Sequence, residues 1–187
     1  MAELPPYTTT SKEDVIVTKL FRLEAHNRTE EGTGKSGEFF VLDAPNWINV
    51  IAITREGKFI LVEQFRHGTN RNEIEIVGGM INDNEDPKDA ALRELREETG
   101  YIPTASSRIE LMGKVHPNPA FLTNKCYNYL VTECELTHEQ SLDEHERINV
   151  SLCSEEEFVE MIRSGKIDHS LVLNAYLWWR LRTSTSF

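Results

Sequence analysis

The sequence predicts an α/β fold in which a mixed β-sheet lies between helices, preceded by a small β-hairpin. Several short segments with the composition of strands precede and surround one central helix, and two more helices close the chain. A doubly wound parallel sheet would instead alternate strands and helices along the chain. The length of 187 residues fits one domain with a small added element.

The N-terminal region is expected to form a loose arm followed by a hairpin. The first dozen residues are polar and include two prolines. Residues 14–23 and 38–42 have the composition of strands, and the polar, glycine-rich stretch 25–37 is expected to join them as a loop. We therefore expect residues 1–45 to form an arm and hairpin, and residues 46–187 to form the main domain.

The main domain is expected to contain six strands and three helices. The strands are β-branched and apolar or alternate with period two, and they cover residues 47–54, 58–65, 73–77, 109–115, 127–132 and 148–152. The helices cover residues 86–100, 154–165 and 170–181. The second helix opens with the capping-box residues Ser154 and Glu157, and Gly165 ends it.

Composition restricts the possible partners and compartment. The net charge of −11 argues against coating a nucleic acid or a membrane surface, because both require a basic face. An anionic substrate would need a local positive charge, for which a metal ion is the obvious source. The N-terminus lacks the features of a signal peptide, and no apolar run approaches the ~20 residues of a membrane span. Three cysteines without ligand spacing favour a reduced compartment, so we expect a cytoplasmic protein.

The central helix carries an unusual group of carboxylates. Its apolar face is expected to pack on the core, whereas Glu94, Glu97 and Glu98 share a neighbouring face. Like charges at Glu94 and Glu98 cost a few tenths of a kcal/mol, and the helix dipole disfavours anions in the last turn. Carboxylates gathered in this way suggest a hard divalent cation. If only these three carboxylates are considered, a solvated acidic face of the helix is the alternative interpretation.

The residue spacing around these carboxylates resembles the Nudix box. Gly79, five residues, Glu85 and seven residues precede Arg93-Glu94-Leu-Arg-Glu97-Glu98-Thr-Gly100-Tyr101, and every specified position of the box is matched. The resemblance implies a Nudix-type α/β/α sandwich with a loop–helix–loop that binds Mg²⁺ or Mn²⁺. It implies that Glu94 and Glu98 are the main metal ligands.

The same resemblance assigns roles to the neighbouring positions. Glu97 would be an additional ligand, and the carbonyl of Gly78 would contribute. Glu85 and Arg93 would brace the loop against the helix. Arg93, Glu97 and Glu98 are therefore predicted to belong to the catalytic group.

Features outside the box resemble the ADP-ribose and nucleoside-diphosphate-sugar pyrophosphatases. These are Arg66 at the end of Glu63-Gln-Phe-Arg66, Glu75 in Glu75-Ile-Val-Gly-Gly, and Pro117, which lies 16 residues beyond Tyr101. The following Asn118-Pro119-Ala120 departs from the pattern usual there, so the resemblance does not extend to the sugar side of the pocket. The resemblance implies metal-dependent hydrolysis of a nucleotide sugar to a nucleoside monophosphate and a sugar phosphate.

Three further residues complete the predicted site. Trp47 could stack on a nucleobase, although an aromatic residue at the start of an apolar strand is more often part of the core. The stretch Glu144-His-Glu146-Arg-Ile resembles a late catalytic loop. A carboxylate coordinated to a cation is a poor proton acceptor, so we expect a residue of this loop to act as the base. We favour Glu146, which would also contact the metal; Glu144 is the second choice, and both could be solvated loop charges.

Two alternatives to this function remain open from sequence. The first is a Nudix hydrolase that acts on dinucleoside polyphosphates, nucleoside triphosphates or a dinucleotide cofactor. The second is a nucleotide-binding regulator without turnover, which the intact box disfavours. The hairpin resembles an element that forms homodimers in such enzymes, and the alternative is an edge decoration of a monomer.

Overall fold

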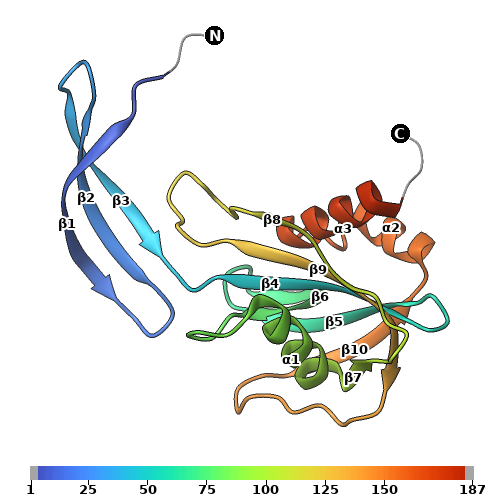
Figure 1. Cartoon of the computed structure of the whole chain (residues 1–187). Coiled ribbons are helices and arrows are strands. Elements are labelled where there is room, and N and C mark those ends of the chain that lie inside the picture. The colour runs from blue at the N-terminus through green and yellow to red at the C-terminus, as the bar shows by residue number, and fades with distance from the viewer. Residues whose placement is uncertain (1–3, 184–187) are drawn as a thin grey trace. The chain divides into compact units, whose positions relative to one another are not determined.

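The computed structural model describes residues 4–183, which cluster into two compact units (Figure 1). The first unit contains the chain up to Pro45 together with His116–Lys125. The second unit contains Asn46–Val115 and the chain from Cys126 onward. Each unit is described below by itself.

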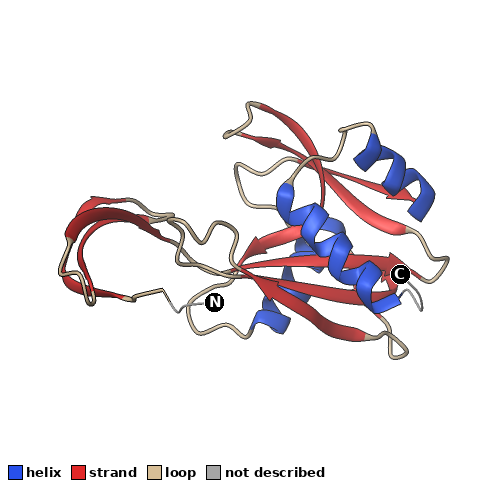
Figure 2. Ribbon diagram, turned by 90° about the horizontal axis from the view of Figure 1, so that it is seen from above, coloured by secondary structure: helices blue, strands red, loops and turns tan. Residues whose placement is uncertain are grey.

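The N-terminal unit contains three strands, where the sequence predicts two. Figure 2 shows β1 (Tyr7–Val17), β2 (Arg22–Glu30) and β3 (Ser36–Asp43) as a curved sheet of their own. The strands are antiparallel, in the order β1-β2-β3.

The expected single strand over residues 14–23 was wrong because a turn divides it. The Thr18 hydroxyl accepts hydrogen bonds from the backbone N–H groups of Leu20 and Phe21, at 3.1 and 3.0 Å. Such side-chain bonds to backbone favour a turn over a continuous strand. The expected loose arm was also wrong, because the β-branched residues Thr8, Thr9 and Thr10 belong to β1.

The second unit contains a mixed sheet, as predicted, with seven strands where six were expected. Its order is β10-β5-β6-β4-β9-β7, and β8 pairs with β9. The β4–β9 pair is parallel and the other pairs are antiparallel. The strands are β4 (Trp47–Thr54), β5 (Phe59–Arg66), β6 (Arg71–Met80), β7 (Tyr101–Pro103), β8 (Ile109–Val115), β9 (Cys126–Leu136) and β10 (Ile148–Cys153). Strand β7 was not predicted, because its three residues are too few to show a period.

Helices cover both faces of this sheet. Figure 1 shows α1 (Pro87–Thr99) on one side, and α2 (Glu155–Arg163) and α3 (Ser170–Thr183) on the other. Each side has its own buried hydrophobic cluster. The second unit is therefore an α/β/α sandwich, which confirms the predicted fold class.

The alternation of strand side chains explains why the sheet has two cores. In β4, Ile48 and Val50 pack in the cluster that contains Leu95 of α1. Their neighbour Ile51 packs in the opposite cluster with Phe158 of α2. Since successive strand residues point to opposite faces, a strand buried on both sides is apolar at most of its positions.

The three cysteines, Cys126, Cys134 and Cys153, are buried as free thiols. Burial raises the pKa of the Cys126 and Cys134 thiols to about 12, which keeps them protonated at neutral pH. Within residues 4–183, no helix has the length and apolar character needed to span a bilayer.

Candidate active site

Helix α1 begins and ends where its capping residues predict. The Asp86 side chain accepts a hydrogen bond from the Lys88 N–H at 2.8 Å, which satisfies one of the free donors of the first turn. Gly100 ends the helix with φ of 76°, a left-handed conformation that glycine adopts without steric cost. Ala91 and Leu95 are fully buried against the sheet. The neighbouring face of the helix is thereby turned toward the pocket described next.

The carboxylates of α1 line a pocket of about 330 Å³ within the second unit. Segments far apart in sequence supply its other walls. The residues predicted for the metal and catalytic groups that line it are Gly78, Arg93, Glu94, Glu97, Glu98 and Glu146, and the predicted substrate residue Arg66 joins them. The structure therefore brings into one pocket residues that were proposed separately from sequence.

Arg93 joins the loop before α1 to the helix. Its guanidinium donates to both carboxylate oxygens of Glu85, at 2.8 and 3.0 Å, and to the Met80 carbonyl at 3.0 Å. It also donates to Glu94 at 2.8 Å and to Glu97 at 3.2 Å. Hydrogen bonding to Glu85 is the main cause that raises the pKa of Arg93, and it lowers the pKa of Glu85 in return. This is the bracing geometry predicted for Glu85 and Arg93.

Glu98 is the most buried carboxylate of the pocket, at 3% exposed. One of its oxygens accepts a hydrogen bond from the Gly78 N–H at 3.3 Å. Burial raises the pKa of Glu98 well above its ordinary value, and the charges of Glu94 and Glu146 add to this rise. Burial also raises the pKa of Glu94. The pocket therefore holds more negative charge than its own cations neutralise.

The Gly78-Gly79 pair allows close packing on two sides of β6. A Cβ atom at Gly79 would lie 2.3 Å from the Glu94 carboxylate, and one at Gly78 would lie 2.8 Å from the Asn49 Oδ1 atom. Any side chain at these positions would displace Glu94 or Asn49. Gly79 therefore sets the approach of β6 to the carboxylates of α1, and Gly78 leaves room for Asn49 of β4.

Glu146 reaches the pocket from the loop that precedes β10. This loop is tied to the end of α1, because the Ser141 N–H donates to the Glu97 carbonyl at 2.9 Å and the Gln140 side chain donates to the Glu98 carbonyl at 2.5 Å. The Glu146 carboxylate accepts a bond from the Asp143 N–H at 3.2 Å. Glu146 lines the pocket, whereas Glu144 is not among the lining residues.

A second pocket, of about 440 Å³, shares a wall with the acidic one. Both are lined by Arg66, Gly78, Gly79 and Met80. Arg66 donates to the two oxygens of Glu75 at 2.6 and 2.8 Å, and this hydrogen bonding raises the pKa of Arg66. The predicted residues Arg66 and Glu75 thus form one bidentate pair where the pockets meet.

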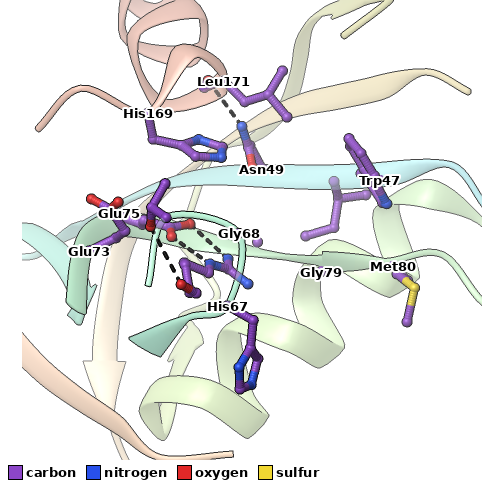
Figure 3. A pocket seen from close by; sticks show the side chains of 14 residues that line it. Trp47, Asn49, His67, Gly68, Glu73, Glu75, Gly79, Met80, His169 and Leu171 are labelled. Atoms are coloured by element: carbon purple, nitrogen blue, oxygen red, sulfur yellow. Dashed lines mark hydrogen bonds and ion pairs between the residues drawn. The ribbon is translucent and has the colours of Figure 1, made fainter. Parts of the chain in front are cut away.

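Part of this second pocket is predicted by the sequence. Trp47 lines it, as Figure 3 shows, whereas Pro117 lies in the N-terminal unit and is not among its lining residues. Asn49, Glu73 and His169 also line the pocket and were missed. Glu73 could have been found, because it precedes Glu75 by two residues in a strand and so shares its face. No sequence motif marks Asn49 or His169.

The donor chemistry of the acidic pocket suits a hard divalent cation. Glu94, Glu97 and Glu98 offer carboxylate oxygens, which Mg²⁺ and Mn²⁺ prefer. Across residues 4–183, no three acidic, histidine or cysteine side chains are already arranged as a complete metal-binding group. Here Arg93 contacts Glu94 and Glu97 instead. The buried, unneutralised Glu98 is the observation that fits a cation.

A helix-borne carboxylate pocket beside a larger pocket in an α/β/α sandwich fits the class of metal-dependent enzymes that bind an anionic substrate. Residues 45–174 match the NUDIX domain family, and the chain belongs to that family of pyrophosphohydrolases. Nudix hydrolases need a divalent metal ion, generally Mg²⁺ or Mn²⁺.

Known proteins similar to this chain agree with that assignment. The ADP-ribose pyrophosphatase of Bacillus subtilis (strain 168) is 31% identical over 160 residues, which cover 85% of this chain and 84% of that protein. The methanol dehydrogenase activator of Bacillus methanolicus is 27% identical over 183 residues, or 97% of each chain. The crystal structure of an ADP compounds hydrolase shares the fold, with a TM-score of 0.84 at 18% identity, covering 97% of this chain and 96% of that one.

Proposed function

We propose that this protein hydrolyses the pyrophosphate of a nucleoside diphosphate sugar of the ADP-ribose type, releasing a nucleoside monophosphate and a sugar phosphate. The observation that carries the proposal is the wall shared by the two pockets at Gly78, Gly79 and Arg66. A pyrophosphate at this wall would face the carboxylates on one side and leave an organic group in the 440 Å³ pocket on the other. The similarity to an ADP-ribose pyrophosphatase supports the same substrate class.

The metal would be held by Glu94 and Glu98, with Glu97 and the carbonyl of Gly78 as further ligands, while Glu146 would face the metal from its loop and stay free to accept a proton. When bound, a divalent ion supplies neutralisation of phosphate charge and activation of water. Arg93 would keep the loop and helix in register, through the bonds to Glu85 and Met80 described above.

The chain's own residues would carry the remaining steps. A water oxygen attacks one phosphorus, a new P–O bond forms and the anhydride P–O bond breaks. Glu146 would accept the proton that this water loses. Arg66, held by Glu75, would bind the phosphate oxygens at the shared wall, and Trp47 would pack against the organic group.

A substrate screen tests this function against the other Nudix substrate classes. Phosphate release, coupled to a phosphatase that acts on the products, is measured with nucleotide sugars, nucleoside triphosphates, dinucleoside polyphosphates and dinucleotide cofactors, first with Mg²⁺ and then with Mn²⁺. We expect ADP-ribose or a related nucleotide sugar to give the highest kcat/KM. Cleavage of triphosphates alone would contradict the proposed substrate, and no turnover of any compound would favour a binding protein.

We further propose that the protein is a homodimer, with the hairpin region between Asp14 and Leu42 in the interface. Every residue of β1 is exposed, and large apolar side chains in this unit, among them Ile16 and Phe40, are half exposed. A small sheet of this kind gains stability when another surface covers its apolar side chains.

Light scattering on the full chain is expected to give the mass of two chains. Phe40→Asp is expected to shift the population toward one chain, because it places a charge within an apolar contact. Leu152→Asp is the matched control, since Leu152 is similarly exposed on β10 of the other unit. A single-chain mass for the unmodified protein would exclude the dimer.

A further inference from the structure

A residue that lines the second pocket carries a buried polar atom without a partner. Across residues 4–183, four buried side-chain nitrogen or oxygen atoms lack a hydrogen-bond partner, and they belong to Arg28, Asn124, Asn128 and His169. Of these, only His169, through its Nδ1 atom, belongs to a residue that lines the 440 Å³ pocket. Buried polar atoms are nearly always hydrogen bonded, so this exception needs a physical explanation.

The backbone around His169 is firmly held. The His169 carbonyl accepts bonds from the Val172 and Leu173 N–H groups at 3.0 and 3.1 Å, in the first turn of α3. Two residues further, the Leu171 carbonyl accepts from the Asn49 side chain of β4 at 3.0 Å. Figure 3 shows His169, Leu171 and Asn49 together at one side of the pocket. The imidazole is therefore carried by an anchored helix start.

The preceding residue is also tied to the sheet. Asp168 accepts two bonds from the Arg71 guanidinium of β6, at 2.8 and 2.7 Å. The same guanidinium donates to Glu73 at 2.8 Å. This pair of contacts places the start of β6 beside the segment that carries His169. A side chain on a backbone segment that is anchored on both sides can select a ligand by position.

The neighbouring side chains restrict the kind of group that His169 can meet. Glu75 is engaged by Arg66, Glu73 by Arg71, and Asn49 by the Leu171 carbonyl. The Glu73–Arg71 and Glu75–Arg66 pairs are each neutral as a whole, so they offer little attraction to a charged ligand group at this side of the pocket. A neutral imidazole nitrogen accepts a hydrogen bond from a hydroxyl group. An uncharged, hydroxyl-bearing group therefore fits best.

We propose that His169 is a specificity-determining residue that accepts a hydrogen bond from a ribose hydroxyl of the bound nucleotide sugar. This inference rests on the proposed function, because the ribose belongs to the proposed substrate. The imidazole rotates about its Cβ–Cγ bond to present its acceptor nitrogen to the hydroxyl. A ribose hydroxyl also finds Glu73 and Glu75 as acceptors on the same side of the pocket, which favours a sugar over an apolar group.

The test compares ADP-ribose with two analogues, one lacking the 2′-hydroxyl of the adenosine ribose and one lacking the corresponding hydroxyl of the terminal ribose. Affinity is measured by calorimetry in excess EDTA, and kcat/KM is measured with Mg²⁺. The unmodified protein is expected to prefer ADP-ribose over one of the two analogues by about 10-fold, the usual value of one neutral hydrogen bond. His169→Phe is expected to bring this ratio close to one, because it weakens the binding of ADP-ribose and leaves the binding of that analogue unchanged.

Two further variants separate recognition from packing. His169→Gln keeps an acceptor oxygen and is expected to retain part of the preference, and it carries the test if the Phe variant does not fold. His138→Phe replaces an exposed histidine outside both pockets and is expected to keep the full ratio. Thermal unfolding midpoints of all variants report any loss of packing.

The outcomes are distinguishable from those that test the proposed function. The role of His169 would be overturned if His169→Phe left the affinity ratio between ADP-ribose and the analogue unchanged. It would also be overturned if the variant lost affinity equally for all three ligands. Equal binding of the three ligands by the unmodified protein would overturn it as well. A preference in binding without turnover of ADP-ribose would support His169 as the hydroxyl acceptor and would reject the proposed function.

Discussion

Replacing Glu98 by glutamine is expected to lower kcat/KM by roughly 10²–10³-fold, the effect of losing one major electrostatic contribution to catalysis. Glutamine has the size of glutamate, so the packing of this buried position is kept. It has no charge to bind a divalent cation, which is the role proposed for Glu98. Turnover of the substrate at the normal rate by this variant, or by the unmodified protein in excess EDTA, would remove the metal from the proposed mechanism.

The same variant is expected to unfold at an equal or higher temperature in the absence of metal. Burial raises the pKa of Glu98, so the folded protein holds this proton to a higher pH than the unfolded chain does. The stability of the metal-free protein therefore falls as pH rises from the ordinary glutamate pKa through the raised one. Glu98→Gln lacks this titration, and its advantage in midpoint is expected to grow with pH.

Glu156→Gln is the matched control, because Glu156 is an exposed glutamate of α2. It is expected to keep both the rate and the pH dependence of the unmodified protein. Thermal midpoints are measured in EDTA from about pH 4, which is close to the ordinary glutamate pKa, to about pH 8. If the metal-free Glu98→Gln protein is less stable than the unmodified protein at the highest pH, the charge of Glu98 is already compensated in the folded protein.

Replacing Glu146 by glutamine is expected to lower kcat by roughly 10²–10⁴-fold, the usual contribution of a general base. Glutamine cannot accept the proton that the attacking water loses. Substrate affinity is expected to change much less, because Glu94, Glu98 and Arg66 remain in place. Single-turnover rates and titration with a non-hydrolysable analogue measure the two quantities separately.

Glu144→Gln is the matched control for this prediction. It lies two residues away in the same loop, but it does not line the carboxylate pocket. We expect its kcat to stay near that of the unmodified protein. A normal kcat for Glu146→Gln would show that Glu146 is not the base. A large loss of kcat with Glu144→Gln would then assign the base to Glu144, and otherwise the base would be a glutamate of the Nudix box.

The parts of the site that sequence predicted are those fixed by local spacing. The capping residues Asp86 and Gly100 determine where α1 begins and ends, so the positions of Glu94 and Glu98 on its surface follow from helix periodicity. The bonds between Arg93 and Glu85 join residues only eight positions apart. Such contacts depend little on the rest of the fold.

The parts that sequence did not predict depend on distant packing. Asn49 and Leu171 are 122 residues apart, and their hydrogen bond forms because α3 packs on β4. His169 enters the pocket through that contact, which no local pattern reveals. The third N-terminal strand was missed for another reason, since Thr8–Thr10 is polar although its β-branched side chains favour a strand.

The products formed from ADP-ribose before and after removal of metal test the central claim most directly. Chromatography of the reaction with Mg²⁺ is expected to show equal amounts of AMP and ribose 5-phosphate. Excess EDTA is expected to abolish both products, and added Mg²⁺ or Mn²⁺ is expected to restore them. Products that form at the same rate in EDTA, or intact ADP-ribose in the presence of either metal, would contradict a metal-dependent nucleotide-sugar pyrophosphatase.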